Sequence, residues 1–291
     1  MKNIKILVLG KNGQLGRSLN YCVKKYNFEN LFSFIQRSDC DMNDLNGVES
    51  FFEKQSFDLI INCAAYTFVD KAESEKSLAN TTNHLALSKL ANISKKNKSR
   101  LIHISSDYVF NGESKIPYKE TDETDPINFY GITKLEGEKV IQKTMLNNAI
   151  IIRAGWIYSE YGNNFVNTML RLEKENQEIN VVSDQIGSPT YAHDLAELII
   201  KIITHKNYFN KTKRTEIYHF SNKGEVSWYE FAKEIFKING SNCQINPIKS
   251  EDYNTLAKRP KYSLLDKGKI INDFNIKLID WRESLKKCLI K

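Results

Sequence analysis

Short apolar runs that alternate with helical patterns fill the first half of the 291-residue chain and constrain its fold most. Runs this continuous in apolar residues are typical of strands buried on both faces of a parallel sheet. The segments between them place apolar residues at helical spacing, as in Ser77–Lys95. We therefore predict an α/β fold with a doubly wound, Rossmann-like parallel sheet. The predicted strands of this half are Ile4–Leu9, Leu31–Gln36, Leu59–Cys63, Leu101–Ser105 and Ala149–Arg153.

A glycine-rich segment, Gly10-Lys-Asn-Gly-Gln-Leu-Gly16, follows the first predicted strand and opens a helix. This setting is the one that a dinucleotide-binding loop requires. Glycines let backbone N–H groups approach a pyrophosphate, and the dipole of the helix N-terminus favours that anion. The alternative is an ordinary strand–turn–helix with incidental glycines. The residues expected to contact the cofactor are Gly10, Asn12, Gly13, Gln14, Leu15 and Gly16.

The residues after the second predicted strand bear on which nicotinamide cofactor is used. A carboxylate there would hold the ribose 2′-hydroxyl of NAD, whereas an arginine could accept the 2′-phosphate of NADP. Arg37 and Asp39 offer both types, and Arg37 favours NADPH, with NADH left open. We also expect cofactor contacts from Asp41, Met42, Ala64, Ala65 and Tyr66. The small residues after the third strand could instead serve only the packing of the sheet.

Tyr130 and Lys134 are four residues apart in a predicted helix, Tyr130–Met145, and so share one helix face. A reductase must protonate the alkoxide that forms when hydride reaches a carbonyl carbon. A free tyrosine, with a pKa of about 10, is a weak participant unless a nearby cation lowers that value. We expect Lys134 to supply this cation. Ser106, at the end of the fourth strand, adds a hydroxyl that could donate to the substrate carbonyl.

The second half of the chain is less regular. Helices are predicted at Gly162–Lys174, Ala192–Thr204, Ser227–Ile238 (with Ser227 as the N-cap) and Asp280–Leu289, and strands at Ile179–Ser183 and Ile217–Ser221. We expect residues 1–157 with 188–220 to form a dinucleotide-binding domain. Residues 158–187 with 221–291 would form a smaller substrate-binding lobe over the carboxyl ends of the strands.

Composition excludes several other classes of protein. The net charge of +7 comes from scattered lysines and arginines without a nucleic-acid-binding motif, so no nucleic-acid partner is expected. The five cysteines form no C-x-x-C pair, which favours reduced thiols in the cytoplasm. We find neither a signal peptide nor a run of about 20 apolar residues, so no membrane association is expected. The histidines lack metal-ligand spacing, and His103 is predicted to be a core residue.

These motifs together resemble the extended short-chain dehydrogenase/reductase family and, within it, the dTDP-4-dehydrorhamnose reductases. The resemblance covers nearly the whole chain. It includes the glycine loop and the segments Asn62–Thr67, Val69–Asp70, Ala72–Glu73, Ser105–Phe110, Pro117–Tyr118, Glu120–Asp122, Asn128–Lys134, Arg153–Tyr158, Gly162–Phe165, Asp184–Thr190, Arg259–Pro260 and Ser263.

The resemblance implies that NAD(P)H reduces the C4 keto group of a dTDP-sugar, dTDP-4-dehydro-L-rhamnose. Ser106 would bind that carbonyl, Tyr130 would supply the proton, and Lys134 would support the tyrosine and the cofactor ribose. Asp107, Tyr108, Trp156 and Asn163 would contact the sugar, although Trp156 could equally be a buried core aromatic. A related 4-keto sugar reductase and, less favoured, a non-catalytic regulatory homologue remain alternatives.

Two positions depart from the family pattern. The family often has threonine where this chain has Ser106, and both residues supply a hydroxyl. The resemblance also implies, for some members, a dimer joined by magnesium and glutamates, one of which lies just past the last glycine of the loop. Ser18 stands at that position, which puts magnesium in doubt and leaves a homodimer open.

Overall fold

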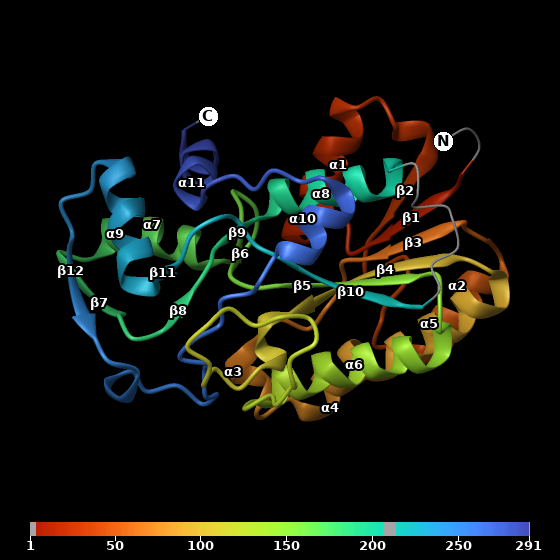
Figure 1. Cartoon of the computed structure of the whole chain (residues 1–291), viewed down its shortest axis with the longest axis horizontal. Helices are drawn as coiled ribbons and strands as arrows, with labels where there is room; N and C mark the ends of the chain where they lie inside the picture. Colours follow the sequence, from red (N-terminus) through yellow and green to blue (C-terminus); the bar gives the residue numbers. More distant parts are fainter. Residues whose placement is uncertain (1–3, 206–213, 291) are drawn as a thin grey trace.

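The computed structural model of the chain describes residues 4–205 and 214–290. The predicted dinucleotide-binding domain and substrate-binding lobe also include residues 1–3, 206–213 and 291, which lie outside the described part. A six-stranded parallel sheet with strand order β10-β5-β4-β3-β1-β2 forms the centre (Figure 1). Its strands are β1 (Ile6–Leu9), β2 (Phe32–Ile35), β3 (Leu59–Asn62), β4 (Arg100–Ser106), β5 (Ala149–Ala154) and β10 (Glu216–Phe220). The predicted doubly wound α/β fold is confirmed.

Side chains alternate between the two faces of the sheet and meet different helices on each. Ile6 and Val8 join one core cluster, whereas Leu7 and Leu9 join another. Helices α1 (Gln14–Lys25), α8 (Ala192–Thr204) and α10 (Gly268–Phe274) cover the first face. Helices α2 (Leu45–Glu53), α5 (Ala86–Asn97) and α6 (Phe129–Met145) cover the second (Figure 1).

The strand order reverses at β1, because β2 pairs on one side of β1 and β3 on the other. Ligands of such sheets bind beyond the carboxyl ends of the strands at this switch point. Leu9, Asn62 and His103 are register partners across β1, β3 and β4. The residues that follow these positions therefore gather at one edge of the sheet.

The helix predicted at Ser77–Lys95 contains an irregular turn. It is built from α4 (Lys76–Asn80), a π-helical turn η2 (Thr81–Leu85) and α5. Asn83 lies in this turn, and its side chain bonds both backbone polar groups of Tyr66, at 2.9 and 3.0 Å. The turn thus aims an amide at the segment that follows β3, which is a common setting for π-bulges at functional sites.

The rest of the chain builds a smaller lobe with its own core. It contains α7 (Phe165–Glu175), α9 (Trp228–Asn239), α11 (Trp281–Leu289) and three two-stranded sheets. The sheets pair β6 (Ile157–Tyr158) with β9 (Thr190–Tyr191), β7 (Glu178–Val182) with β12 (Gln244–Ile248), and β8 (Ile186–Gly187) with β11 (Val226–Ser227). Ser227 is the N-cap of α9, as predicted, and it also forms a complete capping box with Glu230.

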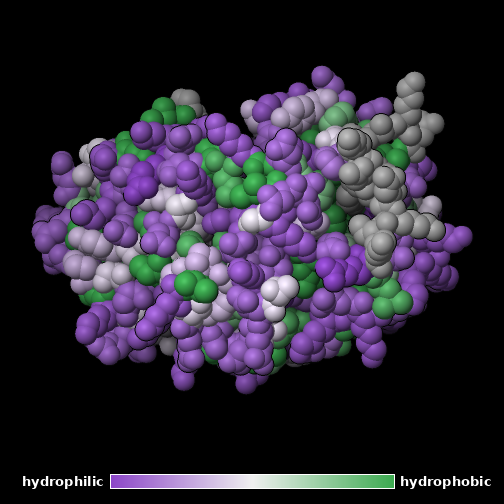
Figure 2. Space-filling view, viewed as in Figure 1, coloured by the Kyte–Doolittle hydropathy of each residue, from purple (hydrophilic) through white to green (hydrophobic). Residues whose placement is uncertain are grey.

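Four short elements complete the secondary structure of the described residues. They are α3 (Val69–Ala72) and the 3₁₀ turns η1 (Glu29–Leu31), η3 (Asp107–Val109) and η4 (Ser250–Asp252). Although α10 belongs to the second half of the chain, its Ile270 and Phe274 pack into the core of the large sheet. On the face seen in Figure 2, hydrophilic residues predominate, and apolar residues gather near the notch between the two parts. None of the helices in the described part of the chain combines the length and apolar character that a membrane crossing needs.

Candidate active site

The loop between β1 and α1 is closed so tightly that two of its glycines have no room for a side chain. Gly10 has a φ of +86°, and a Cβ there would lie 2.9 Å from the Ala64 nitrogen. A Cβ on Gly16 would lie 2.2 Å from the carbonyl oxygen of Gly10. Gly13 is the N-cap of α1, and no side chain caps this helix end. Backbone N–H groups therefore remain available to an anion, which fits the pyrophosphate of a dinucleotide.

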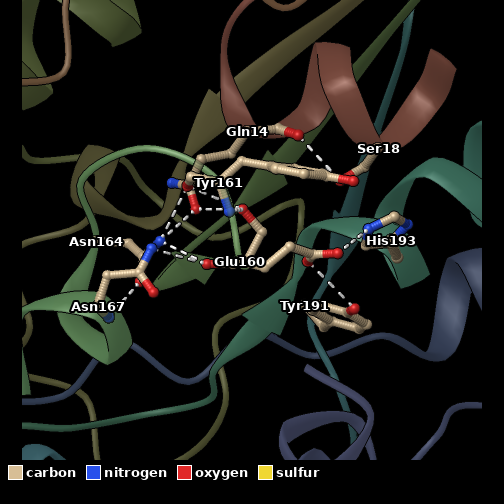
Figure 3. A network of polar contacts seen from close by, with 9 residues as sticks. Gln14, Ser18, Glu160, Tyr161, Asn164, Asn167, Tyr191 and His193 are labelled. Atoms are coloured by element: carbon tan, nitrogen blue, oxygen red, sulfur yellow. Dashed lines mark hydrogen bonds and ion pairs between the residues drawn. The ribbon is translucent and has the colours of Figure 1, made fainter. Parts of the chain in front are cut away.

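The side chain of Gln14 turns towards the second lobe (Figure 3). Its Oε1 accepts hydrogen bonds from Ser159 Oγ at 2.8 Å and Asn164 Nδ2 at 2.9 Å, and its Nε2 donates to the Ile157 carbonyl at 3.3 Å. Gln14 thus ties the glycine loop to the segment that precedes α7. Leu15, the next residue, is buried in the core of the large sheet.

Ser18 is buried in α1, where its hydroxyl donates to the Gln14 carbonyl at 2.9 Å (Figure 3). Below it in the same view, Glu160 lies 3.2 Å from His193 of α8. Across the described ranges 4–205 and 214–290, no group of three or more histidine, cysteine, aspartate or glutamate residues is placed to hold a metal ion.

The predicted adenosine-side residues lie together after β2. Asn12 donates to the Gln36 side chain at 3.0 Å, and Arg37 pairs with Asp41 at 2.9 Å. The side chain of Arg37 is 72% exposed, so its guanidinium can reach a ligand phosphate without first being uncovered. Met42 is buried in the second core cluster.

Ala64, Ala65 and Tyr66 leave the end of β3 and pass the glycine loop. Asn62 Oδ1 accepts from the Ala64 N–H at 3.1 Å, and Asn83 holds the backbone of Tyr66. Both alanines are half-buried, whereas Tyr66 is buried. The two asparagines fix the course of this segment, and the role of Asn83 was not predicted.

The three predicted catalytic residues converge at the carboxyl end of β4. Asn128 caps α6 by accepting from the Gly131 N–H at 2.8 Å, which sets Tyr130 in the first turn and Lys134 one turn later. Ser106 ends β4, and its hydroxyl donates to Asp107 Oδ1 at 3.0 Å. It also hydrogen-bonds Tyr130 and thereby works against the rise in that residue's pKa.

Burial dominates the electrostatics of this group. It raises the pKa of Tyr130 to about 12, with the Ser106 hydroxyl opposing the rise. It lowers the pKa of Lys134 to about 8, with the carboxylate of Glu138 opposing the fall. The Lys134 ammonium donates to the Ile104 carbonyl at 2.7 Å. The expected lowering of the tyrosine pKa by Lys134 is therefore not found, because burial outweighs other influences at Tyr130.

The residues predicted for the sugar side are placed unequally. Asp107 is buried next to Ser106, and burial raises its pKa to about 6. The ring of Tyr108 meets that of Tyr130 edge to face at 5.8 Å between centroids. Asn163 is exposed in the loop before α7.

Trp156 has a left-handed backbone, with a φ of +51°, which a bulky residue adopts only under constraint. Its ring stacks on Trp228 of α9, with centroids 3.4 Å apart and planes 7° apart. Gly187 makes room for the ring, because a Cβ there would lie 2.6 Å from Trp156 Cε2. Trp156 is only half-buried, so part of it stays accessible. The partnership with Trp228 was not predicted.

A second unpredicted feature links the two parts of the molecule beside the site. Arg259 makes a two-pronged ion pair with Asp70 of α3, through Nη1 at 3.1 Å and Nη2 at 2.5 Å. The same carboxylate accepts from the Ala257 N–H at 3.1 Å. Arg259 also lines a cavity of about 1220 Å³ that runs along residues 250–262.

Comparisons with known proteins agree with this geometry. The family model described as the RmlD substrate binding domain matches residues 4–291. The chain is 42% identical to dTDP-4-dehydrorhamnose reductase of Aggregatibacter actinomycetemcomitans over 97% of both chains. It is 39% identical to the spore coat polysaccharide biosynthesis protein SpsK of Bacillus subtilis, over 98% of this chain and 96% of the relative.

Solved structures match equally well. The dTDP-4-dehydrorhamnose reductase of Clostridium acetobutylicum superimposes with a TM-score of 0.90 at 39% identity, covering 98% of each chain. That of Bacillus anthracis, solved in complex with NADP, gives a TM-score of 0.91 at 36% identity, covering 99% of each. The chain therefore belongs to the RmlD substrate-binding-domain family.

Proposed function

We propose that the protein is an NADPH-dependent oxidoreductase that reduces the C4 keto group of dTDP-4-dehydro-L-rhamnose to give dTDP-L-rhamnose for polysaccharide synthesis. The observation that carries the proposal is the convergence of Ser106, Tyr130 and Lys134 at the carboxyl end of β4. This end of the sheet also holds the glycine loop. Full-length relatives named dTDP-4-dehydrorhamnose reductase support the choice of reaction and substrate.

Each residue of the trio has a distinct task. The Ser106 hydroxyl donates to the C4 carbonyl oxygen and so stabilises the charge that develops there. Tyr130, which burial keeps protonated at neutral pH, gives its hydroxyl proton to the same oxygen. Lys134 would support Tyr130 and the ribose of the cofactor. NADPH, when bound, supplies the hydride.

The cofactor would lie along the glycine loop. Gly10, Gly13 and Gly16 would face its pyrophosphate, and Arg37 would pair with the 2′-phosphate that distinguishes NADPH from NADH. The remaining predicted contacts complete this surface: Asn12, Gln14, Leu15, Asp41, Met42, Ala64, Ala65 and Tyr66.

The sugar would lie between the trio and the second lobe, against Asp107, Tyr108, Trp156 and Asn163. The cavity beside Arg259 is large enough for the rest of a dTDP-sugar. Its lining includes the cationic side chains of Lys115, Lys258, Arg259 and Lys261 and the carboxylates of Glu113, Glu251 and Asp252. The excess of one positive charge suits a diphosphate. We propose that the enzyme is cytoplasmic and that it forms a homodimer.

A second candidate reaction keeps the chemistry and changes the sugar. The chain is 34% identical to dTDP-4-keto-6-deoxy-D-glucose reductase of Streptomyces niveus over 89% of its length. The residues that carry the chemistry would serve either substrate. A regulatory role is disfavoured, because a non-catalytic protein has no chemical need for the complete trio.

The deciding experiment follows NADPH oxidation with both 4-keto sugars, and with NADH in parallel. Tyr130→Phe should lose turnover by about a hundredfold or more while still binding NADPH. Tyr229→Phe, which removes a hydroxyl from α9 in the second lobe, serves as the control and should keep full turnover. Unchanged turnover in Tyr130→Phe would refute the assignment of the proton donor. Faster turnover of the second sugar would move the substrate assignment to it.

A further inference from the structure

His103 contacts both Asn62 at the end of β3 and the catalytic residue Lys134 of α6. It lies on β4, three residues before Ser106, and is only 1% exposed, as expected for a core residue. Its Nδ1 lies 3.1 Å from Asn62 Nδ2, and its Nε2 lies 3.5 Å from Lys134 Nζ. The imidazole thus stands between the end of β3 and the catalytic lysine.

The amide of Asn62 decides which nitrogen of His103 carries the proton. Asn62 Oδ1 accepts from the Ala64 N–H at 3.1 Å, so the NH₂ group of Asn62 must face the histidine. An NH₂ group only donates, which makes Nδ1 the acceptor. A neutral imidazole has a single N–H, and it must then be on Nε2, facing Lys134.

We propose that His103 presents an N–H donor to Lys134 and is a positioning residue that favours the neutral amine of Lys134 over its ammonium. The separation of 3.5 Å is long for a hydrogen bond, as expected where an N–H faces an ammonium. Burial and the charge of Lys134 lower the pKa of His103 well below its usual value, which keeps the ring neutral.

A second buried histidine provides an internal comparison. His219 of β10 is 0% exposed, and its Nδ1 lies 3.0 Å from the Tyr118 carbonyl oxygen. A carbonyl only accepts, so this ring carries its proton on Nδ1. Its Nε2 lone pair then faces Arg153 Nη1 at 3.4 Å, which is the favourable arrangement beside a cation. The two histidines therefore have opposite tautomers, and the one beside Lys134 has the arrangement that disfavours the cation.

This arrangement matters when Tyr130 has to be reprotonated, a consequence that rests on the proposed function. Tyr130 passes its hydroxyl proton to the substrate oxygen and becomes a tyrosinate. An ammonium proton of Lys134 then restores the tyrosine and leaves a neutral amine. The lone pair of that amine can accept the His103 Nε2–H, until Lys134 takes up a proton from water. His103 thus stabilises the form of Lys134 that follows proton donation.

Other ionisable groups lie on the elements packed around Lys134. Glu138 lies one turn further along α6 and raises the pKa of Lys134, while Arg153 of β5 pairs with Glu138. Tyr130 lies one turn earlier on the same helix, and Asp107 follows the end of β4. Burial is the largest influence, and it lowers the pKa to about 8.

The tautomer can be measured on the free protein without any assay of activity. Long-range proton–nitrogen NMR correlation on histidine-labelled protein distinguishes the protonated nitrogen of each ring. The signals of His103 and His219 are assigned by their loss in His103→Gln and His219→Gln. We expect His103 to be protonated on Nε2 and His219 on Nδ1. A His103 ring that is protonated on Nδ1, or on both nitrogens, overturns the proposal whatever the enzyme's substrate is.

Kinetics test the effect on Lys134. The glutamine side chain in His103→Gln can turn its carbonyl towards the ammonium, which raises the pKa of Lys134. The alkaline limb of kcat/KM should then move to higher pH by about one unit. His219→Gln is the matched control and should leave this limb in place. A loss of kcat in His103→Gln with an unmoved alkaline limb would mean that His103 only fills space, and would overturn its proposed effect on Lys134.

Discussion

Glu138 and Arg153 form an ion pair within the interior, and replacing Glu138 with glutamine tests how α6 is held against the sheet. The side chains are 1% and 3% exposed. Arg153 Nη2 donates to Glu138 Oε2 at 2.7 Å and Nε donates to Oε1 at 2.9 Å, with the Ser105 hydroxyl as a further donor to Oε1. Glu138→Gln preserves the shape of the side chain but leaves the guanidinium without its counter-charge.

The expected cost follows from the burial of both partners. Breaking a fully buried pair by removing one charge costs about 3–5 kcal/mol, since the remaining ion stays desolvated. At roughly 2 °C per kcal/mol for a chain of nearly 300 residues, Tm should fall by about 6–10 °C. Replacing both residues, as in Glu138→Gln with Arg153→Met, should cost less than the single change, because no bare charge is left.

Thermal unfolding followed by circular dichroism measures these differences. The exposed pair Arg171–Glu175, with side chains 60% and 53% exposed at 2.9 Å, supplies the matched control. Glu175→Gln should lower the free energy of unfolding by no more than about 0.5 kcal/mol. If Glu138→Gln and Glu175→Gln destabilise the protein equally, or if the double variant is less stable than Glu138→Gln, the reasoning from burial is refuted.

Two further changes test the glycine loop and the residue next to Ser106. In Gly16→Ala the added Cβ would lie 2.2 Å from the Gly10 carbonyl oxygen, so the loop would have to shift. Fluorescence titration should then show that NADPH binds about tenfold or more weakly. Unchanged affinity would contradict the tight geometry of the loop. Burial raises the pKa of Asp107 to about 6, so the folded chain binds this proton more tightly than the unfolded chain. The free energy of unfolding therefore falls as pH rises from about 4 to 6. Asp107→Asn should therefore raise the unfolding free energy above pH 6 by up to about 3 kcal/mol, with little gain near pH 4 in denaturant titrations, and an equal gain at both pH values would exclude this origin.

The strands of the large sheet and the helices that cover it could be predicted, because their buried residues recur at regular spacing in the sequence. The predicted Leu59–Cys63 became β3 (Leu59–Asn62), and the predicted Ala192–Thr204 became α8 with identical bounds. The two-residue strands β6, β8, β9 and β11 were missed, since two residues are too few to show a period. The π-turn at Thr81–Leu85 was also missed, because its apolar spacing differs little from that of a helix.

The candidate site divides in the same way. The glycine loop and the pair Tyr130 and Lys134 are local patterns, so they could be predicted from the sequence alone. Trp228 and Arg259 are defined by partners far along the chain, Trp156 and Asp70, and no local spacing announces such contacts. These partners became visible only when the fold placed both parts of the chain around one edge of the sheet.

The buried side of α6 carries charged residues, although the extent of this helix was predicted closely. Lys134 and Glu138 are charged, yet both are buried, at 1% and 0% exposed, one turn apart in line with Tyr130. Residue type alone would place such side chains at the surface. Their burial is tolerable because each has partners: the Ile104 carbonyl for Lys134 and the Arg153 guanidinium for Glu138. The Glu138 carboxylate raises the pKa of Lys134, whereas burial lowers it. The proposed N–H of His103 would lower it as well. A lysine balanced between these influences, with its pKa at about 8, can both give and regain a proton near neutral pH, which a fully solvated lysine does far less readily.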